Sequence, residues 1–349
     1  MQSGQTRRLE QQLVLPKPSL ASPIPGATPH FTDLDGLRGI AVLAVMAYHF
    51  GAPFMSGGYL GVDVFFVVSG FVVTRNLVRL LDEPGWVATF YGRRISRLYP
   101  TLLAFLAALL LSWLAEGELD GGATVALVGA LAMSYNLAAS FLGAELDGAL
   151  ILWSLAVEWH FYLLLPALML PARHRVAPHV RALALVVLAG AVAAVRLWAL
   201  TRSDLNAFDV YLATWFRLDG LLLGAAAALV PASVFRVLPH RLLVDIGLAT
   251  TVAAMVVGPH WGTRAPITLG VIVPAVGVAV LAVVVGTVGR GSAPVGGRLG
   301  STLCSRPLLW AGRRSYSLYL WHYLIGVVPK RPPTGADPRP TVPTTTAST

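Results

Sequence analysis

Long apolar stretches separated by short polar segments fill most of the chain. A helix needs about 20 consecutive apolar residues to cross a bilayer, and many of these stretches approach that length. They lie at about 37–55, 58–80, 100–115, 123–141, 149–171, 180–200, 209–231, 241–258 and 266–288, with a shorter one at 315–328. The pattern predicts an all-α, polytopic transmembrane helical bundle of about 9–10 spans.

The composition supports a membrane protein. The 349 residues are 56% hydrophobic and 12% charged, whereas about 25% charged is typical of soluble domains. The net charge of +9 has two readings, because basic residues gather in cytoplasmic loops near anionic lipid and also form grooves for anionic substrates. We expect membrane lipid as a partner and no nucleic acid. Cys304 is the only cysteine, so no intramolecular disulfide can form.

The two polar ends differ from the apolar middle. Residues 1–35 are rich in Pro, Ser and Thr, include basic side chains and lack the apolar core of a signal peptide. We expect a disordered cytoplasmic N-terminal tail there, and a membrane domain at 36–328. Residues 329–349 are rich in Pro and Thr and are expected to be disordered.

Basic loops give conflicting information on sidedness. The loops at 173–181, 236–241 and 290–314 agree with one another, and the loop at 75–97 agrees with the N-terminus. Three candidate spans lie between the two groups, and an odd number of crossings cannot return to the same side. Either one segment between 100 and 171 is re-entrant, or the charge rule fails for one group.

The first two apolar segments contain ionisable residues. Arg38 and His49 are eleven residues apart, which places them on nearly the same face of a helix with about 16 Å of rise between them. Asp63 lies within the second apolar segment. Ionisable groups inside a membrane are costly and usually face a bundle interior or a wet cavity. A neutral imidazole at His49 could act as a general base on a hydroxyl.

Three arginines precede the third apolar segment. Arg93, Arg94 and Arg97 lie in a stretch that we expect to be a cytoplasmic loop, with Pro100 in the first turn of the following helix. One interpretation is positive-inside anchoring. The other is a phosphate clamp, because Arg94 and Arg97 would be neighbours on a helix and guanidinium groups bind phosphates in a bidentate manner.

The stretch W-S-L-A-V-E-W-H-F-Y-L begins at Trp153 and holds further polar side chains. Glu158 and Tyr162 lie one turn apart on a shared face, whereas His160 would point elsewhere. The carboxylate, the phenol and Trp153 could bind a hydroxylated acceptor. An interfacial aromatic belt would explain the Trp and Tyr but not the glutamate.

Two later stretches carry charge or imidazole. Arg217 and Asp219 are two residues apart and cannot face each other on a helix, so each needs a partner from another span. Asp63 and Glu158 are the candidate partners of Arg217. Trp321 and His322 follow in the last apolar segment, where an interfacial histidine and a substrate-binding one are both open readings.

Six motifs in this order resemble the acyltransferase 3 family of integral membrane O-acyltransferases, which modify surface polysaccharides, lipopolysaccharide, peptidoglycan or antibiotics. The motifs are L-D-G-L-R-G-I-A-V-L-A-V-M-A-Y-H, G-V-D-V-F-F-V-V-S-G-F, R-R-I-S-R-L-Y-P, L-W-S-L-A-V-E-W-H-F-Y, F-R-L-D-G-L-L-L-G and S-Y-S-L-Y-L-W-H. The match runs from about 33 to 324. Each motif is weak alone, and the six together are specific.

The resemblance implies transfer of an acyl group, commonly acetyl from acetyl-coenzyme A, to a hydroxyl at or beyond the membrane. It implies that His49 is the essential histidine and Arg38 its partner, that Arg93, Arg94 and Arg97 handle the donor, and that Glu158 is the acidic residue of its motif. Two features depart from the family. His160 stands where the family usually has a glutamine-like residue, and the last apolar segment ends after about fourteen residues, short of a full span.

We therefore expect an acyltransferase that moves an acyl group from acetyl-coenzyme A, or another acyl-coenzyme A, to a glycan, a lipid-linked sugar or a small-molecule acceptor. We expect it in the bacterial plasma membrane, with the N-terminus cytoplasmic and no metal. His49 would be the base, and Arg38 would orient it or stabilise developing negative charge. The alternatives are a transporter or flippase, because intramembrane charges also build substrate pathways, and an inactive, truncated relative.

Overall fold

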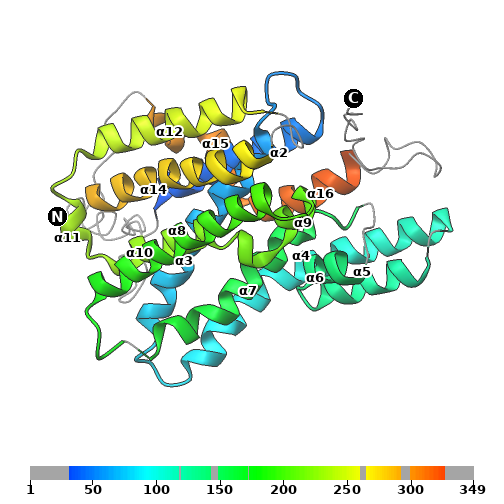
Figure 1. Ribbon diagram of the computed structural model, residues 1–349, viewed down its shortest axis with the longest axis horizontal. Coiled ribbons are helices and arrows are strands. Elements are labelled where there is room, and N and C mark those ends of the chain that lie inside the picture. Colours follow the sequence, from blue (N-terminus) through cyan, green and yellow to red (C-terminus); the bar gives the residue numbers. More distant parts are fainter. Residues whose placement is uncertain are drawn as a thin grey trace, which may run out of the picture. The chain divides into compact units, whose positions relative to one another are not determined.

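The computed structural model describes residues 31–117, 119–142, 148–171, 173–259, 265–291 and 299–326. Most of the residues assigned above to the two tails lie outside these ranges. Residues 32–35, expected in the N-terminal tail, instead form the first turn of a helix. Every element of the described chain is helical (Figure 1), which confirms the all-α class. The longer helices are α2 (Thr32–His49), α3 (Gly61–Leu80), α4 (Trp86–Glu116), α7 (Leu152–Met169), α8 (Pro178–Arg202), α12 (His240–Val257) and α14 (Val273–Arg290).

Shorter elements connect and cap these helices. They are η1 (Gly58–Leu60), α5 (Gly121–Leu131), α6 (Tyr135–Leu142), α9 (Ala207–Leu212), η2 (Thr214–Phe216), α10 (Asp219–Leu229), α11 (Ala232–Phe235), α13 (Ala265–Ile267), the π-helix η3 (Thr268–Ile272), η4 (Gly300–Cys304), α15 (Arg306–Arg313) and α16 (Ser315–Gly326). Six described helical segments are long and apolar enough to cross a membrane: Gly58–Leu80, Trp86–Glu116, Leu152–Met169, Pro178–Arg202, His240–Val257 and Thr268–Arg290.

Two of the predicted spans are interrupted, which corrects their reading as continuous helices. The segment at 123–141 divides into α5 and α6 at Met133, whose φ of 53° is in the left-handed region. The segment at 209–231 divides into α9, η2 and α10 around Arg217. Periodicity alone missed both breaks, because the residues around them are apolar enough to continue a helix. At both breaks, non-helical backbone and polar side chains contact neighbouring helices.

The contacts between loops settle the conflict over sidedness. Arg173 donates to the Leu81 carbonyl oxygen (2.7 Å) and pairs with Asp82, so the loop after α7 lies beside the loop after α3. Arg290 at the end of α14 pairs with Asp33 at the start of α2. Arg173 and Arg290 therefore lie on the same side of the bundle as the start of α2 and the loop after α3. The short helices α5 and α6 fit the re-entrant alternative, because neither is long enough to cross.

The arginine-rich stretch before the third apolar segment is helical, and this corrects the expected loop. It belongs to α4, a single helix of 31 residues that runs through Pro100. The helix starts after Gly85 and ends before Gly117, both with positive φ. Proline is tolerated within membrane helices, where neighbouring groups compensate for the lost hydrogen bond. Continuous helix before the proline fixes the arginines on one rigid element.

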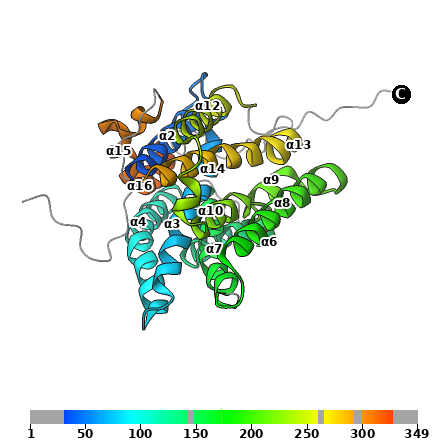
Figure 2. The same ribbon diagram turned by 90° about the vertical axis from the view of Figure 1, so that its left-hand side faces the viewer.

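Helix α3 lies between two hydrophobic clusters. Its side chains Val64 and Phe71 belong to a cluster built mainly with α2, α12 and α14, whereas Phe66 and Leu77 belong to one built with α4, α7, α10 and α16. The views in Figures 1 and 2 show α12 and α14 side by side, with α4 and α7 apart from them on the other side of α3. Because α3 is packed on both sides, Asp63 on it is buried.

Helices α3 and α10 approach each other at two glycines. A Cβ added at Gly70 would meet the Leu221 carbonyl, and one added at Gly224 would meet the Val67 carbonyl. Small residues let membrane helices pack closely without a Cβ between the backbones. This close contact brings the residues that precede α10 against the first turn of α3.

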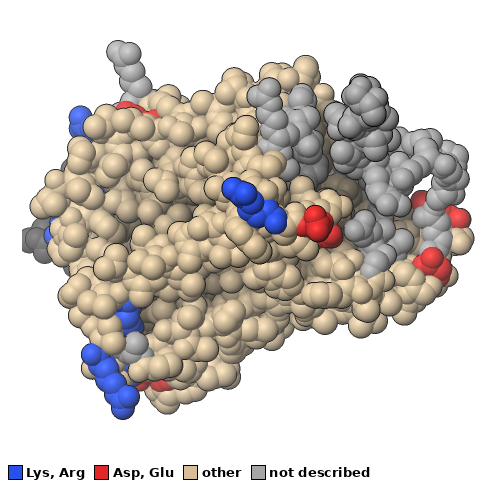
Figure 3. Space-filling view, viewed as in Figure 1, with Lys and Arg blue, Asp and Glu red and all other residues tan. Residues whose placement is uncertain are grey.

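The exposed surface is apolar over long helices. On α8, Leu183, Val187 and Trp198 are each about 60% exposed. Figure 3 shows a face on which Lys, Arg, Asp and Glu are few and widely spaced. A soluble protein rarely leaves such contiguous apolar area in water, so lipid is the medium that covers these helices. The protein is an integral membrane protein.

Candidate functional site

A pocket between α2, α3, α4, α7 and α16 collects polar side chains from all five helices. Its empty volume, counted with the part open to solvent, is about 880 Å³. The polar lining consists of Arg38, Ser69, Arg94, Arg97, Ser154, Glu158, Tyr162, Ser315, Tyr316 and Tyr319. Five of the residues singled out from the sequence are therefore brought together from three helices that are distant in the chain.

Arg38 is held at the pocket by the start of α16. Its Nη2 donates to Ser315 Oγ at 2.9 Å, and its guanidinium lies 5.9 Å from the centre of the Phe65 ring. No described carboxylate lies within ion-pair distance of Arg38. Its charge is therefore available to a ligand in the pocket.

Arg94 and Arg97 both line the pocket from α4, as their spacing predicted. Arg94 is buried, lies against the rings of Phe90 and Tyr162 at 5.7 and 5.8 Å, and has an Nε with no hydrogen-bond partner in the described chain. Arg93 does not line the pocket and is exposed. The predicted cluster of three is thus a pair in the pocket and one surface residue.

Helix α7 presents Glu158 and Tyr162 to the pocket on one face, which confirms that expectation. The Tyr162 hydroxyl bonds Ser69 Oγ at 2.8 Å. Glu158 forms no hydrogen bond or ion pair with the residues that the structure describes. Three arginines thus share the pocket with one carboxylate, and the excess positive charge suits an anionic ligand.

His160 lies away from the pocket, as predicted, and has a structural explanation. Its Nε2 bonds Ser134 Oγ at 3.1 Å and its Nδ1 bonds Thr214 Oγ1 at 2.8 Å. Thr214 also accepts from Asn136 at 2.8 Å. The imidazole therefore ties together the two interrupted helical segments, one at each nitrogen.

His49 lies at the end of α2, where its Nδ1 is 2.9 Å from His322 Nε2. Arg38 and His49 thus face α16 at Ser315 and His322, two turns apart, which fits the shared stripe predicted for α2. The partner of the imidazole is His322 and not Arg38, contrary to one of the two roles expected for the arginine. Tyr319 lines the pocket and contacts the His322 ring, with 5.9 Å between ring centres.

Two tryptophans named from the sequence stay outside the pocket. Trp321 packs edge-to-face on Phe105 of α4, with ring centres 6.2 Å apart. Trp153 contacts Tyr211 at 4.4 Å and Phe66 at 6.0 Å between ring centres. Both side chains are packed between helices, as an aromatic structural role requires.

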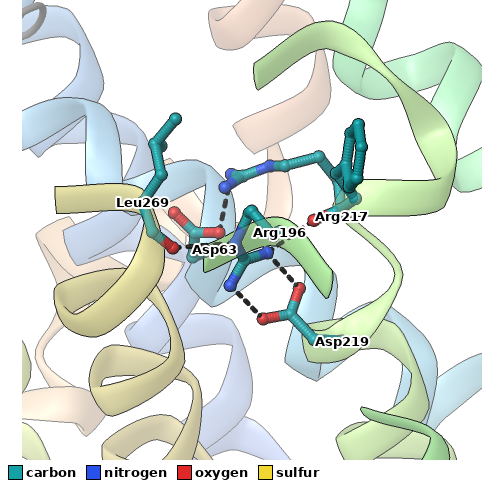
Figure 4. Close-up of polar contacts among 6 residues, drawn as sticks. Asp63, Arg196, Arg217, Asp219 and Leu269 are labelled. Atoms are coloured by element: carbon teal, nitrogen blue, oxygen red, sulfur yellow. Dashed lines mark hydrogen bonds and ion pairs between the residues drawn. The ribbon is translucent and has the colours of Figure 1, made fainter. Parts of the chain in front are cut away.

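Asp63, Arg217 and Asp219 belong to a separate cluster of buried charge (Figure 4). Arg217 Nη2 donates to Asp63 Oδ1 at 2.7 Å, so Asp63, and not Glu158, is its partner. Asp219 receives two hydrogen bonds from Arg196, at 3.0 and 2.8 Å. Arg196 also donates to the carbonyl oxygens of Phe216 and of Leu269 in η3. Each charged residue has a partner from another element, as the i, i+2 spacing predicted for Arg217 and Asp219.

Sequence reasoning missed several of these residues. Arg196 lies within the long apolar stretch of α8, and the argument that drew attention to Asp63 applies equally to it. Ser315 and Tyr319 are one turn apart in the motif that supplied His322, and both face the pocket. Ser69 gave no signal, because a serine among small apolar residues is common in membrane helices.

Cysteine chemistry is absent from the pocket. Cys304 lies in η4, outside the pocket, and its thiol donates to Asp33 Oδ1 at 3.1 Å. Burial and the adjacent Asp33 carboxylate raise the pKa of this thiol to about 11. Among the described residues, no three His, Cys, Asp or Glu side chains are grouped to hold a metal ion.

Known proteins are similar in sequence to this chain over most of its length. Residues 31–328 match the family described as an acyltransferase domain. The chain is 31% identical to the O-acetyltransferase OatA of Staphylococcus aureus, over 85% of this chain and 50% of that protein. It is 30% identical to the peptidoglycan O-acetyltransferase OatA of Listeria monocytogenes, over 84% of this chain and 49% of that protein.

A third relative is matched over more of its own length. The chain is 31% identical to the putative membrane-bound transacylase BcsY of Komagataeibacter xylinus, over 83% of this chain and 72% of that protein. By contrast, it spans about half the length of the two OatA proteins. No solved structure matches it. On the family match and the six motifs, the chain belongs to the acyltransferase 3 family of integral membrane acyltransferases.

Proposed function

We propose that the protein transfers an acyl group, acetyl in the simplest case, from acyl-coenzyme A to a hydroxyl of a glycan or another envelope acceptor. The observation that carries the proposal is the pocket, which holds Arg38, Arg94 and Arg97 beside a single carboxylate. Coenzyme A is an anionic donor with phosphates, and guanidinium groups are suited to phosphates. The buried Arg94 Nε, which lacks a described partner, is a donor that a phosphate oxygen would satisfy.

The pocket also extends along α3 from the donor-binding arginines toward His49, as such a transfer would need. Its lining on α3 extends from Val73 to Val62, a rise of about 16 Å. Gly61 at the far end lies against Ala41 and Val45, one turn before His49 on α2. A donor held by its phosphates at Arg94 and Arg97 would therefore extend along α3 toward the histidine end.

His49 would act as the general base. It would take the proton of the acceptor hydroxyl while the oxygen attacks the thioester carbonyl. The carbon–sulfur bond then breaks, and the coenzyme A thiolate receives the proton from the imidazolium. An ester and free coenzyme A result. We assign Arg38 to the donor and not to His49, because its side chain bonds Ser315 in the pocket.

The shared side of the basic loops gives the proposed orientation. Basic loops are cytoplasmic in membrane proteins, and coenzyme A is a cytoplasmic metabolite. We therefore propose a bacterial plasma membrane location with the start of α2 and the loop between α3 and α4 on the cytoplasmic side. The acceptor would approach His49 from the opposite side.

The test is acyl transfer from radiolabelled acetyl-coenzyme A in vesicles that contain the full chain, His49→Ala or no added protein. We expect label in the glycan or lipid fraction only with the intact chain, and only in inverted vesicles, whose cytoplasmic face is outside. Undiminished transfer by a folded His49→Ala variant would exclude His49 as the base. Flux of a glycan or lipid without acyl transfer would favour a transporter instead.

A further inference from the structure

The two histidines where α2 meets α16 form a hydrogen-bonded chain in which the donor and the acceptor of each hydrogen bond can be assigned. His322 Nδ1 lies 3.1 Å from the Leu318 carbonyl oxygen. A carbonyl only accepts hydrogen bonds, so this nitrogen carries the proton. In a neutral imidazole the other nitrogen then has the lone pair, and His322 Nε2 is an acceptor.

That acceptor determines the tautomer of His49. His49 Nδ1 lies 2.9 Å from His322 Nε2, and one of the two must donate. Since His322 Nε2 accepts, His49 carries its proton on Nδ1.

The alternative charge state is unfavourable here. A doubly protonated His322 would donate to His49 and leave the proton of His49 on Nε2. This arrangement places an imidazolium in a residue that is 4% exposed. No carboxylate in the described ranges forms an ion pair with either histidine. A buried charge without a partner is costly, so two neutral rings are the stable arrangement.

We propose that His322 is a positioning residue that holds the proton of His49 on Nδ1, so that Nε2 is the nitrogen that receives the acceptor's proton. The proposal rests on the acyl transfer proposed above. Tyr323 packs edge-on against the His49 ring, at 90° and with ring centres 5.4 Å apart, which limits rotation of the imidazole. No described residue bonds His49 Nε2, so its lone pair is open to the acceptor hydroxyl. His322 has both nitrogens occupied and supports the base without being one.

The hydrogen bond between the two histidines would also stabilise the imidazolium that forms when His49 accepts a proton. When His49 Nε2 takes a proton, Nδ1–H still donates to His322 Nε2. This hydrogen bond then has a charged donor and becomes stronger. The logic is that of the third member of a catalytic triad, which fixes the tautomer and orientation of the base, with an imidazole in place of a carboxylate.

Two substitutions at His322 separate positioning from packing. In His322→Gln the amide oxygen lies near the former Nε2 and can accept from His49 Nδ1, whereas His322→Leu fills the space without an acceptor. By analogy with groups that orient a metal-bound histidine, we expect His322→Leu to lower kcat by about 10–100-fold. The KM for acetyl-coenzyme A should not change, because the arginines are elsewhere. His322→Gln should retain kcat within a few-fold.

The assay uses the full chain in membrane vesicles with radiolabelled acetyl-coenzyme A, beside His49→Ala. Equal losses in the Gln and Leu variants, or none in either, would overturn the proposal for His322. If His49→Ala is inactive in the same assay, the proposed function stands even then. If His49→Ala is fully active, His49 is not the base and the role proposed for His322 fails with it, whereas the proposed function itself fails only if the intact chain transfers no label.

A spectroscopic measurement on the unmodified residue does not depend on how the variants fold. Nitrogen-15 NMR of histidine-labelled protein distinguishes a protonated ring nitrogen from a bare one, with the His49→Ala spectrum as the assignment. We expect a protonated Nδ1 and a bare Nε2 at His49 in the intact protein. A protonated Nε2 with a bare Nδ1 would overturn the proposal.

Discussion

The three buried arginines of the described chain have two different surroundings. Arg196 and Arg217 are fully buried, and each pairs with a carboxylate from another element. Arg94 is also buried and also lies against aromatic rings, but it forms no ion pair with any described carboxylate. A buried charge normally has a partner or borders water or a ligand. The paired arginines therefore belong to the architecture, and the absence of an ion pair at Arg94 is consistent with the donor-binding role that we propose for it.

The energetic cost of burying charge also indicates the role of the ion pairs formed by Arg196 and Arg217. Taking two ions out of water is expensive, so an ion pair of this kind adds little net stability relative to apolar residues, although breaking it is strongly destabilising. Here both pairs surround the interruption between α9 and α10, where Asp63 of α3 and Arg196 of α8 meet Arg217 and Asp219. The pairs specify where the broken segment docks against α3 and α8.

The largest effect is expected from Asp63→Asn. The substitution keeps the size of the side chain but leaves Arg217, which is 0% exposed, without its carboxylate. We expect the free energy of unfolding to fall by about 3–5 kcal/mol, measured by unfolding in detergent. The double variant Asp63→Leu with Arg217→Met removes both charges and should recover most of the loss. A single variant as stable as the intact protein would contradict the architectural role.

An intermediate effect, on binding rather than stability, is expected from Arg97→Ala. Removing one charged hydrogen-bond donor to a phosphate costs about 1.5–3 kcal/mol, which raises the KM for acetyl-coenzyme A by roughly 10–150-fold. Arg93→Ala is the matched control, because this residue is exposed on the same helix and does not line the pocket. Steady-state kinetics in vesicles measure both variants. Equal KM changes would show that general positive charge, and not the pocket, attracts the donor.

The smallest effect is expected from Asp82→Asn. Asp82 pairs with Arg173 between two loops, but its side chain is 77% exposed. Exposed ion pairs contribute about 0–1 kcal/mol because water screens both charges. The thermal unfolding midpoint in detergent should hardly change. A loss as large as that of Asp63→Asn would mean that burial does not govern the strength of ion pairs in this protein.

Much of the candidate site could be predicted from local spacing. Arg94 with Arg97 and Glu158 with Tyr162 each share a helix face, so their joint orientation follows from helical periodicity. The need of Arg217 and Asp219 for outside partners followed in the same way. Periodicity within one helix says nothing about which neighbouring helix lies opposite. For that reason Asp63 and Glu158 were both open as partners of Arg217.

The interrupted segments show where local reasoning failed. The stretch around Met133 and the stretch around Arg217 are apolar enough for continuous helices, and the sequence predicts a loop before Pro100. In each case contacts from elsewhere override the local preference. His160 bonds Ser134 and Thr214 at the two interruptions. The Tyr162 ring of α7 packs on Arg94 of α4.

Hydrophobic length and ordered motifs are local properties of the chain, and they are enough to identify a helical membrane protein of the acyltransferase 3 family. The packing of the helices is needed to show that His49 bonds His322, that Arg196 completes the buried charges and that Arg93 lies outside the pocket. Contacts of this kind join residues that are far apart along the chain. His49 and His322 are 273 residues apart, and only the packing of α2 against α16 brings them within a hydrogen bond.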